Sequence, residues 1–299
     1  MLVILKTLLL RDERVNQPTN IVGIDAETDG LFGFDEIGGP TAVDTFTIGS
    51  STYAIVVSQQ DDSVTIIDVS NPSNIVEVDT EPDGLNGFEE LDRPFGVDTF
   101  TIGANTYAIV TAFRDDGVQI IDVSNPENIV AKDYLTDTDG ALLELDGAKG
   151  VDTFTIGANT YAIVTAVADN GVQIIDVTNP ESIIALSNLE DFDEHDRLNG
   201  AFDVEIFTIG ASTYAIVASN ADNAVQMIDV SDPEDIRALQ FIPDDNFLLL
   251  QKPKGVDTFT VDSSTYAIVA SFGDNGVQMI DISDPENISA TISLPDTES

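Results

Sequence analysis

The sequence predicts an all-β protein with the β-propeller fold, built from five repeats of four strands each. Three phrases recur in step along the chain, and the repeats start at spacings of 54, 54, 53 and 52 residues. Each phrase reads as a short strand, and no window keeps the 3.6-residue period of a helix over the length of a helix. Because one blade cannot bury both of its faces alone, such repeats must stack around an axis.

The strands of each repeat can be placed in order. Val-Asp-Thr-Phe-Thr-Ile, which begins at Val43 in the first copy, is rich in β-branched residues and forms the first. Thr-Tyr-Ala-Ile-Val forms the second. A tight turn follows, because pairs such as Asp116-Gly117 accept the positive φ that a two-residue turn requires. Val-Gln-Ile-Ile-Asp-Val forms the third strand. It ends at Ser-Asn-Pro, because Pro has no N–H to donate to a neighbouring strand. The fourth strand begins near Asn128 in the second copy.

The sequence contains one more fourth-strand segment than five blades need. The fourth-strand pattern occurs six times and each of the others five times, because residues 21–25 and residues 288–294 both carry it. Three arrangements follow. We favour a five-bladed ring with one strand outside the ladder. The alternatives are an incomplete six-bladed ring or part of a longer protein, and a spare strand that pairs with a neighbouring chain, as unpaired edges do. Residues 1–20 are interpreted as an N-terminal extension, and residues 21–299 as one propeller domain.

A family resemblance rests on the third-strand phrase. Ile-Ile-Asp-Val-Ser-Asn-Pro, which ends at Pro126 in the second copy, follows Tyr-Ala-Ile-Val and turns such as Asp169-Asn170-Gly171. In this order the phrases resemble the LVIVD-repeat propellers, a family found largely in secreted or surface proteins of bacteria and archaea. The resemblance implies a propeller in an extracellular or cell-surface location. The apolar residues 1–10 are too short for a membrane span and lack the flanks of a signal peptide.

Composition excludes several classes of protein. The chain has 54 acidic and 11 basic residues, for a net charge of −43. Binding to nucleic acid or to anionic lipid needs clustered Lys and Arg, so we expect no nucleic-acid partner and no membrane insertion. The 42% of apolar residues predicts a folded protein and not an acidic tail. No Cys and one His exclude thiolate and multi-histidine metal sites. A saline habitat would screen the repulsion between the carboxylates.

Two loops between blades have the spacing of a calcium loop, with acids at positions 1, 3, 5 and 12 and Gly at position 6, and a third keeps part of it. Alternate residues of such a loop point inward and offer the oxygens that Ca²⁺ prefers. An acidic turn copied with its repeat would show the same pattern without metal. The candidate calcium ligands are Asp25, Glu27, Asp29, Leu31 and Glu36 in the first loop, Asp79, Glu81, Asp83, Leu85 and Glu90 in the second, and Asp137 and Asp139 in the third.

Carboxylates are also expected near the axis, because one position of the first strand is acidic in every repeat: Asp44, Asp98, Asp152, Glu205 and Asp257. They could bind a cation together. Strand parity groups each of them with Phe and Ile, which favours local hydrogen bonds instead. His195, the single histidine, lies in an acidic loop and is interpreted as a solvated residue and not as a general base.

The likeness of the repeats favours a non-enzymatic function, because catalysis needs one acid, one base and one pocket, and no blade stands out. We expect an extracellular or cell-surface module for binding, adhesion or assembly. It would be stabilised by calcium and would pair with copies of itself through exchange of a terminal strand. Its protein or carbohydrate ligand is not identified. The alternative is a calcium-dependent, lactonase-like hydrolase with the metal in the central channel, for which the axial carboxylates are the only support.

Overall fold

The computed structural model of the protein describes residues 23–30, 34, 36–139, 143–191, 196–245 and 247–290. These residues form five sheets of four antiparallel strands each, which confirms the predicted five blades of an all-β fold. None of the described residues belongs to a helix that could span a membrane. The predicted N-terminal extension, residues 1–20, lies outside the described part of the chain, as does His195.

Each blade is made by one repeat. The first blade contains β1 (Pro40–Ile48), β2 (Ser51–Ser58), β3 (Ser63–Asp68) and β4 (Val76–Pro82). The second contains β5 (Pro94–Ile102), β6 (Asn105–Ala112), β7 (Gly117–Asp122) and β8 (Val130–Thr136). The third contains β9 (Ala148–Ile156), β10 (Asn159–Ala166), β11 (Gly171–Asp176) and β12 (Ile184–Glu190). The fourth contains β13 (Ala201–Ile209), β14 (Ser212–Ser219), β15 (Ala224–Asp229) and β16 (Arg237–Pro243). The fifth contains β17 (Pro253–Val261), β18 (Ser264–Ser271), β19 (Gly276–Asp281) and β20 (Ser289–Ala290).

The recurring phrases set the register inside each blade. Phe46 of β1 faces Tyr53 of β2, and their ring centroids lie 5.7 Å apart. The same pair recurs in the other four blades, so an aromatic contact fixes the first two strands against each other. The next hairpin turns at a residue with positive φ, for example Asp116 at 53° and Asn170 at 61°. The predicted positive φ is confirmed, but the predicted two-residue turn is wrong, because Ala112 pairs with Gly117 and Ala166 with Gly171, which leaves loops of four residues.

The apolar core lies between blades. One cluster contains Val172 and Ile174 of β11 together with Ala215 and Val217 of β14, and all four are fully buried. The other large clusters likewise join residues of two successive blades. Each blade therefore gains most of its apolar burial from its neighbours, as expected for stacked repeats.

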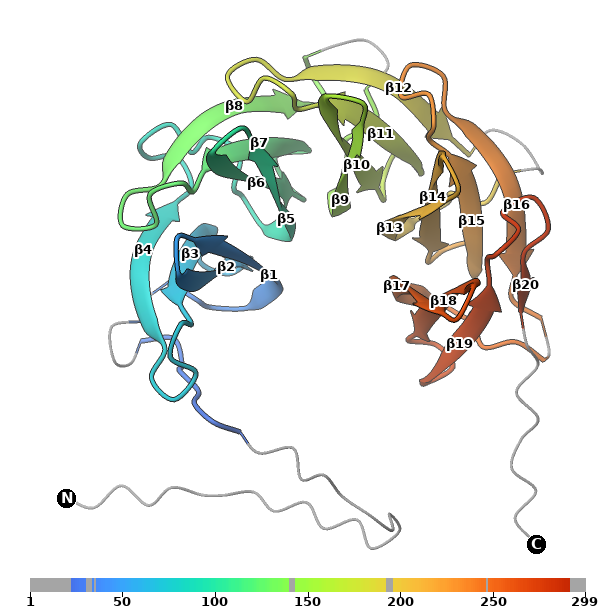
Figure 1. Cartoon of the computed structure of the whole chain (residues 1–299), viewed down its shortest axis with the longest axis horizontal. Helices are drawn as coiled ribbons and strands as arrows, with labels where there is room; N and C mark the ends of the chain where they lie inside the picture. The colour runs from blue at the N-terminus through green and yellow to red at the C-terminus, as the bar shows by residue number, and fades with distance from the viewer. Residues whose placement is uncertain are drawn as a thin grey trace, which may run out of the picture.

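The five blades form an open arc (Figure 1). Substantial contacts join β1 to β5, β5 to β9, β9 to β13 and β13 to β17, whereas no comparable contact between described residues joins β1 to β17. The fifth blade takes its outer strand, β20, from its own repeat, and residues 23–28 form no strand. The blade count is thus confirmed, but the N-terminal segment does not complete the last blade.

Candidate functional site

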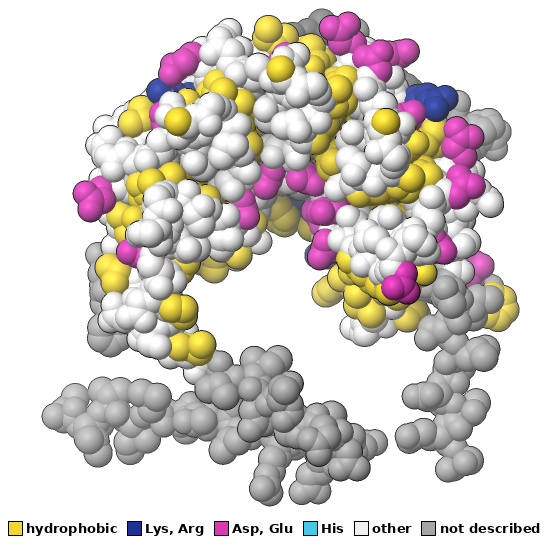
Figure 2. Space-filling model, viewed as in Figure 1, with side chains coloured by type: hydrophobic (Ala, Val, Ile, Leu, Met, Phe, Trp, Pro, Cys, Tyr) yellow, Lys and Arg dark blue, Asp and Glu magenta, His cyan; other side chains and the backbone are white. Residues whose placement is uncertain are grey.

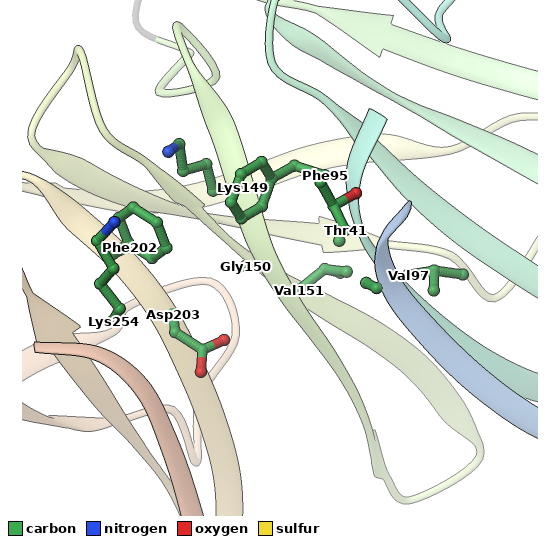
Figure 3. A pocket seen from close by; sticks show the side chains of 11 residues that line it. Thr41, Phe95, Val97, Lys149, Gly150, Val151, Phe202, Asp203 and Lys254 are labelled. Atoms are coloured by element: carbon green, nitrogen blue, oxygen red, sulfur yellow. The ribbon is translucent and has the colours of Figure 1, made fainter. Parts of the chain in front are cut away.

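A cavity of about 230 Å³ lies at the axis of the arc (Figure 3). Its wall comes from the N-terminal ends of all five innermost strands, β1, β5, β9, β13 and β17. An inner strand runs close to the axis in every blade, so one position of the repeat is presented five times to the same space. A difference between repeats at this position therefore changes the chemistry of the cavity wall.

The repeats differ at the position that lines this cavity. The residue two places before the first valine of the inner strand is a threonine, an aromatic residue or a lysine: Thr41, Phe95, Lys149, Phe202 and Lys254. The following residue is Gly in three blades but Asp203 in the fourth. The prediction that no blade stands out is wrong at this point, because the variation is confined to a few residues among otherwise similar strands.

Lys149 lies among aromatic rings. Its Nζ is 4.0 Å from the ring centroid of Phe202 and 4.3 Å from that of Phe95, and these two rings meet edge to face with centroids 5.5 Å apart. Burial lowers the pKa of Lys149 to about 8, and the like charges of Lys254 and Arg93 add to the decrease. The amine is therefore close to the point where it can give up or accept a proton near neutral pH.

Two further cations stand beside Lys149. The Nζ of Lys254 lies 4.7 Å from the ring centroid of Phe272, and the guanidinium of Arg93 lies 5.8 Å from that of Phe113. Within the described part of the chain, none of these three cations forms an ion pair. In a protein with only 11 basic residues, three of them gather around one cavity. Lys149 and Lys254 line the cavity together with Asp203, and Arg93 lies near Lys149.

Most of the axial carboxylates tie neighbouring blades together, and Figure 2 shows acidic side chains along the inner rim of the arc. Asp98 Oδ2 accepts a hydrogen bond of 2.9 Å from the Thr153 N–H, and Asp152 Oδ2 accepts one of 2.6 Å from the Ile206 N–H. Asp44 makes the same bond to Thr99. The expected hydrogen bonds are thus made, but they reach the next blade and not the adjoining loop.

The fourth blade breaks this pattern. Asp203 Oδ2, and not Glu205, accepts the hydrogen bond from the fifth blade, at 2.9 Å from the Val256 N–H. The Glu205 side chain makes no hydrogen bond to any other described residue. Burial raises the pKa of Glu205 to about 8, and the negative charges of Asp152 and Asp257 add to the rise. Glu205 is therefore a largely protonated acid at neutral pH that has no structural hydrogen bond to maintain.

Two carboxyl groups near Glu205 have lower pKa values than Glu205 itself. Burial raises the pKa of Asp152 to about 7, and that of Asp203 to about 6. Asp203 lines the cavity, and Glu205 lies two residues further along β13 on the same side of the strand. Carboxyl groups whose pKa values are pushed apart in one site can serve as proton donor and proton acceptor. The sequence signal for this arrangement is the pair Asp203 and Glu205, where the other repeats have Gly or Ala followed two residues later by Asp.

The predicted calcium ligands hold backbone groups in place. Asp79 lies in β4 and accepts a hydrogen bond of 2.8 Å from the Ile129 N–H of the next blade, and Asp25 accepts the equivalent bond of 2.9 Å from Ile75. Asp83 Oδ1 accepts a bond of 2.9 Å from the Leu91 N–H across its own loop. One oxygen of each of these carboxylates is therefore already used to shape the loop or to join two blades.

The remaining candidates are placed as follows. Glu90 is buried, and burial together with the charges of Asp115, Asp83 and Asp139 raises its pKa to about 8. Other contacts are local: Asp29 to Ile37, Glu81 to Asn86, Asp137 to Leu145, Asp139 to Thr136 and Leu85 to Phe88. The backbone carbonyl of Glu36 accepts a hydrogen bond from Ser63, Glu27 is half-buried, and Leu31 lies outside the described residues. The described residues contain no group of three or more His, Asp or Glu that could hold a metal ion, and calcium binding stays a prediction.

Four stretches of the chain match the LVIVD repeat, residues 50–80, 106–136, 160–190 and 263–293. No curated relative is similar enough in sequence to count as a match. Among solved structures, a protein from Lactobacillus plantarum is 13% identical with a TM-score of 0.60, over 85% of this chain and 70% of that one. The periplasmic gluconolactonase PpgL of Pseudomonas aeruginosa is 12% identical with a TM-score of 0.60, over 81% of this chain and 66% of that one. At this identity the likeness shows the fold alone.

The expectation of a non-enzymatic binding, adhesion or assembly module is contradicted. Propellers of this fold include the gluconolactonase and a GH32 β-fructofuranosidase of Bombyx mori, which is 12% identical with a TM-score of 0.50 over 86% of this chain and 63% of that one. The propeller fold therefore does not argue against catalysis. The inner strands also differ at the axis, where the basic Lys149 and the acidic Asp203 come from different blades.

Proposed function

Because this chain is an LVIVD-repeat β-propeller whose blades place threonine, phenylalanine or lysine at its axis, we propose that it is a hydrolase of small carbohydrate-derived substrates, a sugar lactone or a related ester. The observation that carries the proposal is Glu205, which is released from joining the blades by Asp203 and has a pKa raised to about 8. A protonated carboxyl of this kind can give its proton to a leaving oxygen.

The cavity supplies the other parts of the reaction. The rings of Phe95 and Phe202 line the cavity around Lys149 and give it an apolar wall against which a sugar ring can pack. Asp203, whose pKa is raised only to about 6 by burial, is ionised at neutral pH and can take a proton from the attacking water. Water then adds to the carbonyl carbon, and the ring oxygen leaves as a hydroxyl with the proton of Glu205. Each step uses a side chain at or beside the cavity.

Calcium was expected in the channel under the hydrolase alternative, and the described residues do not fit it. The axial carboxylates Asp44, Asp98 and Asp152 are engaged with backbone N–H groups of the next blade, and they form no compact set of metal ligands. The reaction proposed here is therefore written without a metal step. An extracellular or cell-surface location also stays a prediction.

The test is hydrolysis of a panel of sugar lactones, aryl esters and aryl glycosides by the purified chain, compared with spontaneous hydrolysis. Glu205→Gln removes the proton but keeps the shape, and should lower kcat by about 100-fold or more. Glu127→Gln, at an exposed position far from the axis in the repeat, is the matched control and should keep full activity. The rate should also fall as the pH rises through about 8, where Glu205 loses its proton. Full activity of Glu205→Gln, or no turnover of any substrate, would overturn the proposal.

A further inference from the structure

The fifth blade exposes a face that is buried at every internal junction. Val277 of β19 is 57% exposed, whereas the corresponding valines of the other blades are 0% exposed: Val64, Val118, Val172 and Val225. Phe259 of β17 is 39% exposed, against 6% for its counterpart Phe154. These residues belong to the side of a blade that normally packs on the next blade in the chain. Among the described residues, the outer side of the last blade is thus half of a junction with no partner blade.

The first blade exposes the other half. Val43 of β1 is 62% exposed, although its counterparts Val204 and Val256 are 3% and 8% exposed. Beside it lies an apolar hollow of about 400 Å³ lined by residues that include Ile37, Val56 and Ile67. Apolar side chains are visible at both ends of the arc (Figure 2). The two ends therefore carry opposite halves of one repeated interface.

The apolar residues of the two faces match those that meet inside the arc. At the junction between the third and fourth blades, Val172 and Ile174 pack with Ala215 and Val217. The equivalent residues at the ends are Val277 and Met279 on the fifth blade, and Val56 on the first, where the equivalent Ala54 is already buried in a cluster with Phe34. The same shapes can then meet across a contact between two copies.

The polar groups match as well. At internal junctions the residue at the hairpin tip accepts a hydrogen bond from the next blade: Asn170 Oδ1 from the Gly200 N–H at 3.0 Å, and Asn223 Oδ1 from the Lys252 N–H at 2.9 Å. The equivalent acceptor and donor at the ends are Asn275 and the N–H of Gly39, and neither makes such a bond within the described chain.

The inner strands offer a second matched pair. Asp98 binds the Thr153 N–H across one junction, and the same two positions at the ends are Asp257 and Thr45. The Asp257 side chain makes no hydrogen bond to another described residue. Two separate hydrogen bonds and one apolar patch are thus complementary between the last blade and the first. A blade of this sequence is therefore a partner that fits both faces.

We propose that the fifth-blade face of one copy packs on the first-blade face of a second copy. The two faces of one chain stand on opposite sides of the gap in the arc (Figure 1), so the contact joins different copies head to tail. Each blade keeps its own four strands, which distinguishes this contact from exchange of a terminal strand. With a net charge of −43 on each copy, the association should strengthen as salt screens the repulsion. The interaction does not depend on the proposed hydrolase activity.

The test is the mass of the 299-residue chain in solution by light scattering and sedimentation, over a range of protein and salt concentrations. We expect the mass to rise with both. Val277→Asp and Val43→Asp each remove one face and should give monomers. A mixture of the two variants should give a defined dimer, because each retains the face that the other lacks. Val130→Asp is the matched control, since Val130 is 42% exposed on the outer strand β8, and it should associate as the unmodified chain does.

Circular dichroism and the melting temperature of dilute samples establish that each variant is folded, which is expected because the substituted side chains are exposed. Asn275→Ala is a milder variant that removes one hydrogen-bond acceptor, and it should weaken association by several-fold. A monomeric unmodified chain at the highest protein and salt concentrations would overturn the proposal. So would normal association of Val43→Asp, which strand exchange at the C-terminus would permit, and so would a mixture of the two Asp variants that stays monomeric.

Discussion

Asp203 Oδ2 accepts a hydrogen bond of 2.9 Å from the Val256 N–H, and this bond joins the fourth blade to the fifth. In the third blade the same connection is made two residues further along the strand, by Asp152 to the Ile206 N–H. Because Asp203 makes the connection in the fourth blade, the Glu205 side chain is not needed to join that blade to the fifth. A change of two residues in one repeat therefore turns a structural carboxylate into a candidate acid.

Loss of the Asp203 carboxylate should destabilise the protein. Asp203→Ala leaves the buried Val256 N–H without its acceptor, and we expect the free energy of unfolding to fall by about 1–3 kcal/mol. Asp203→Asn keeps an oxygen in place and should cost less. Urea denaturation at neutral pH measures both variants. Equal stability of Asp203→Ala and the unmodified chain would contradict the role given to this bond.

The lysines at the axis should favour substrates that carry a negative charge. Lys149 and Lys254 have no ion pair within the described chain, so a carboxylate or phosphate on the substrate would gain their full attraction. Lys149→Met and Lys254→Met should each raise KM for an anionic substrate by about tenfold, equivalent to about 1.4 kcal/mol, and change KM for a neutral one much less. Lys252→Met, which removes an exposed lysine outside the cavity, is the control. An equal effect on charged and neutral substrates would count against charge recognition.

Stability should fall as the pH rises from about 5 to about 8. Burial raises the pKa of Glu90 to about 8 and that of Glu144 to about 9, and a hydrogen bond between Glu144 and Glu190 adds to the latter. In this range the folded state holds protons that the unfolded state releases, so the free energy of unfolding decreases with pH. Denaturant unfolding at several pH values measures the slope. Glu144→Gln, which cannot ionise, should reduce the slope, and an unchanged slope would contradict the assignment.

Calcium in the loops between blades is tested by a thermal melt. An ion bound only by the folded loops stabilises the fold by mass action, so the melting temperature should be higher in millimolar Ca²⁺ than in EDTA. Mg²⁺ at the same concentration controls for screening of the net charge. Asp79→Asn should reduce the calcium effect. Identical melts in Ca²⁺, Mg²⁺ and EDTA would show that the acidic spacing is turn chemistry alone.

Equivalent valines should contribute differently to the free energy of unfolding, depending on the blade in which they lie. Val172→Ala removes two methyl groups from a fully buried junction and should cost about 2 kcal/mol, whereas Val277→Ala should cost less than about 0.5 kcal/mol in dilute protein, because Val277 is 57% exposed. Denaturation of both variants at low protein concentration gives the comparison. Similar losses would mean that the fifth-blade face is covered within a single chain.

Much of the blade could be predicted from the sequence. The first two strands, the positive φ at Asp116 and the break after the third strand all depend on residues close together in the chain. The acidic loops differ, since the spacing that includes Asp79 and Asp83 is that of a metal loop, yet Asp79 lies in a strand and bonds to Ile129, which is 50 residues away. Spacing alone does not reveal such a partner.

By itself, the sequence determined the number of blades, the order of their strands and the positions of their turns, because alternation of side chains and the backbone preferences of Gly, Pro and Asn act locally. Only the tertiary structure decided which repeat position faces the axis, how Asp203 takes over from Glu205, and that the arc leaves one blade face open at each end. These features depend on how one blade is placed against the next, and that placement comes from packing between residues about fifty positions apart.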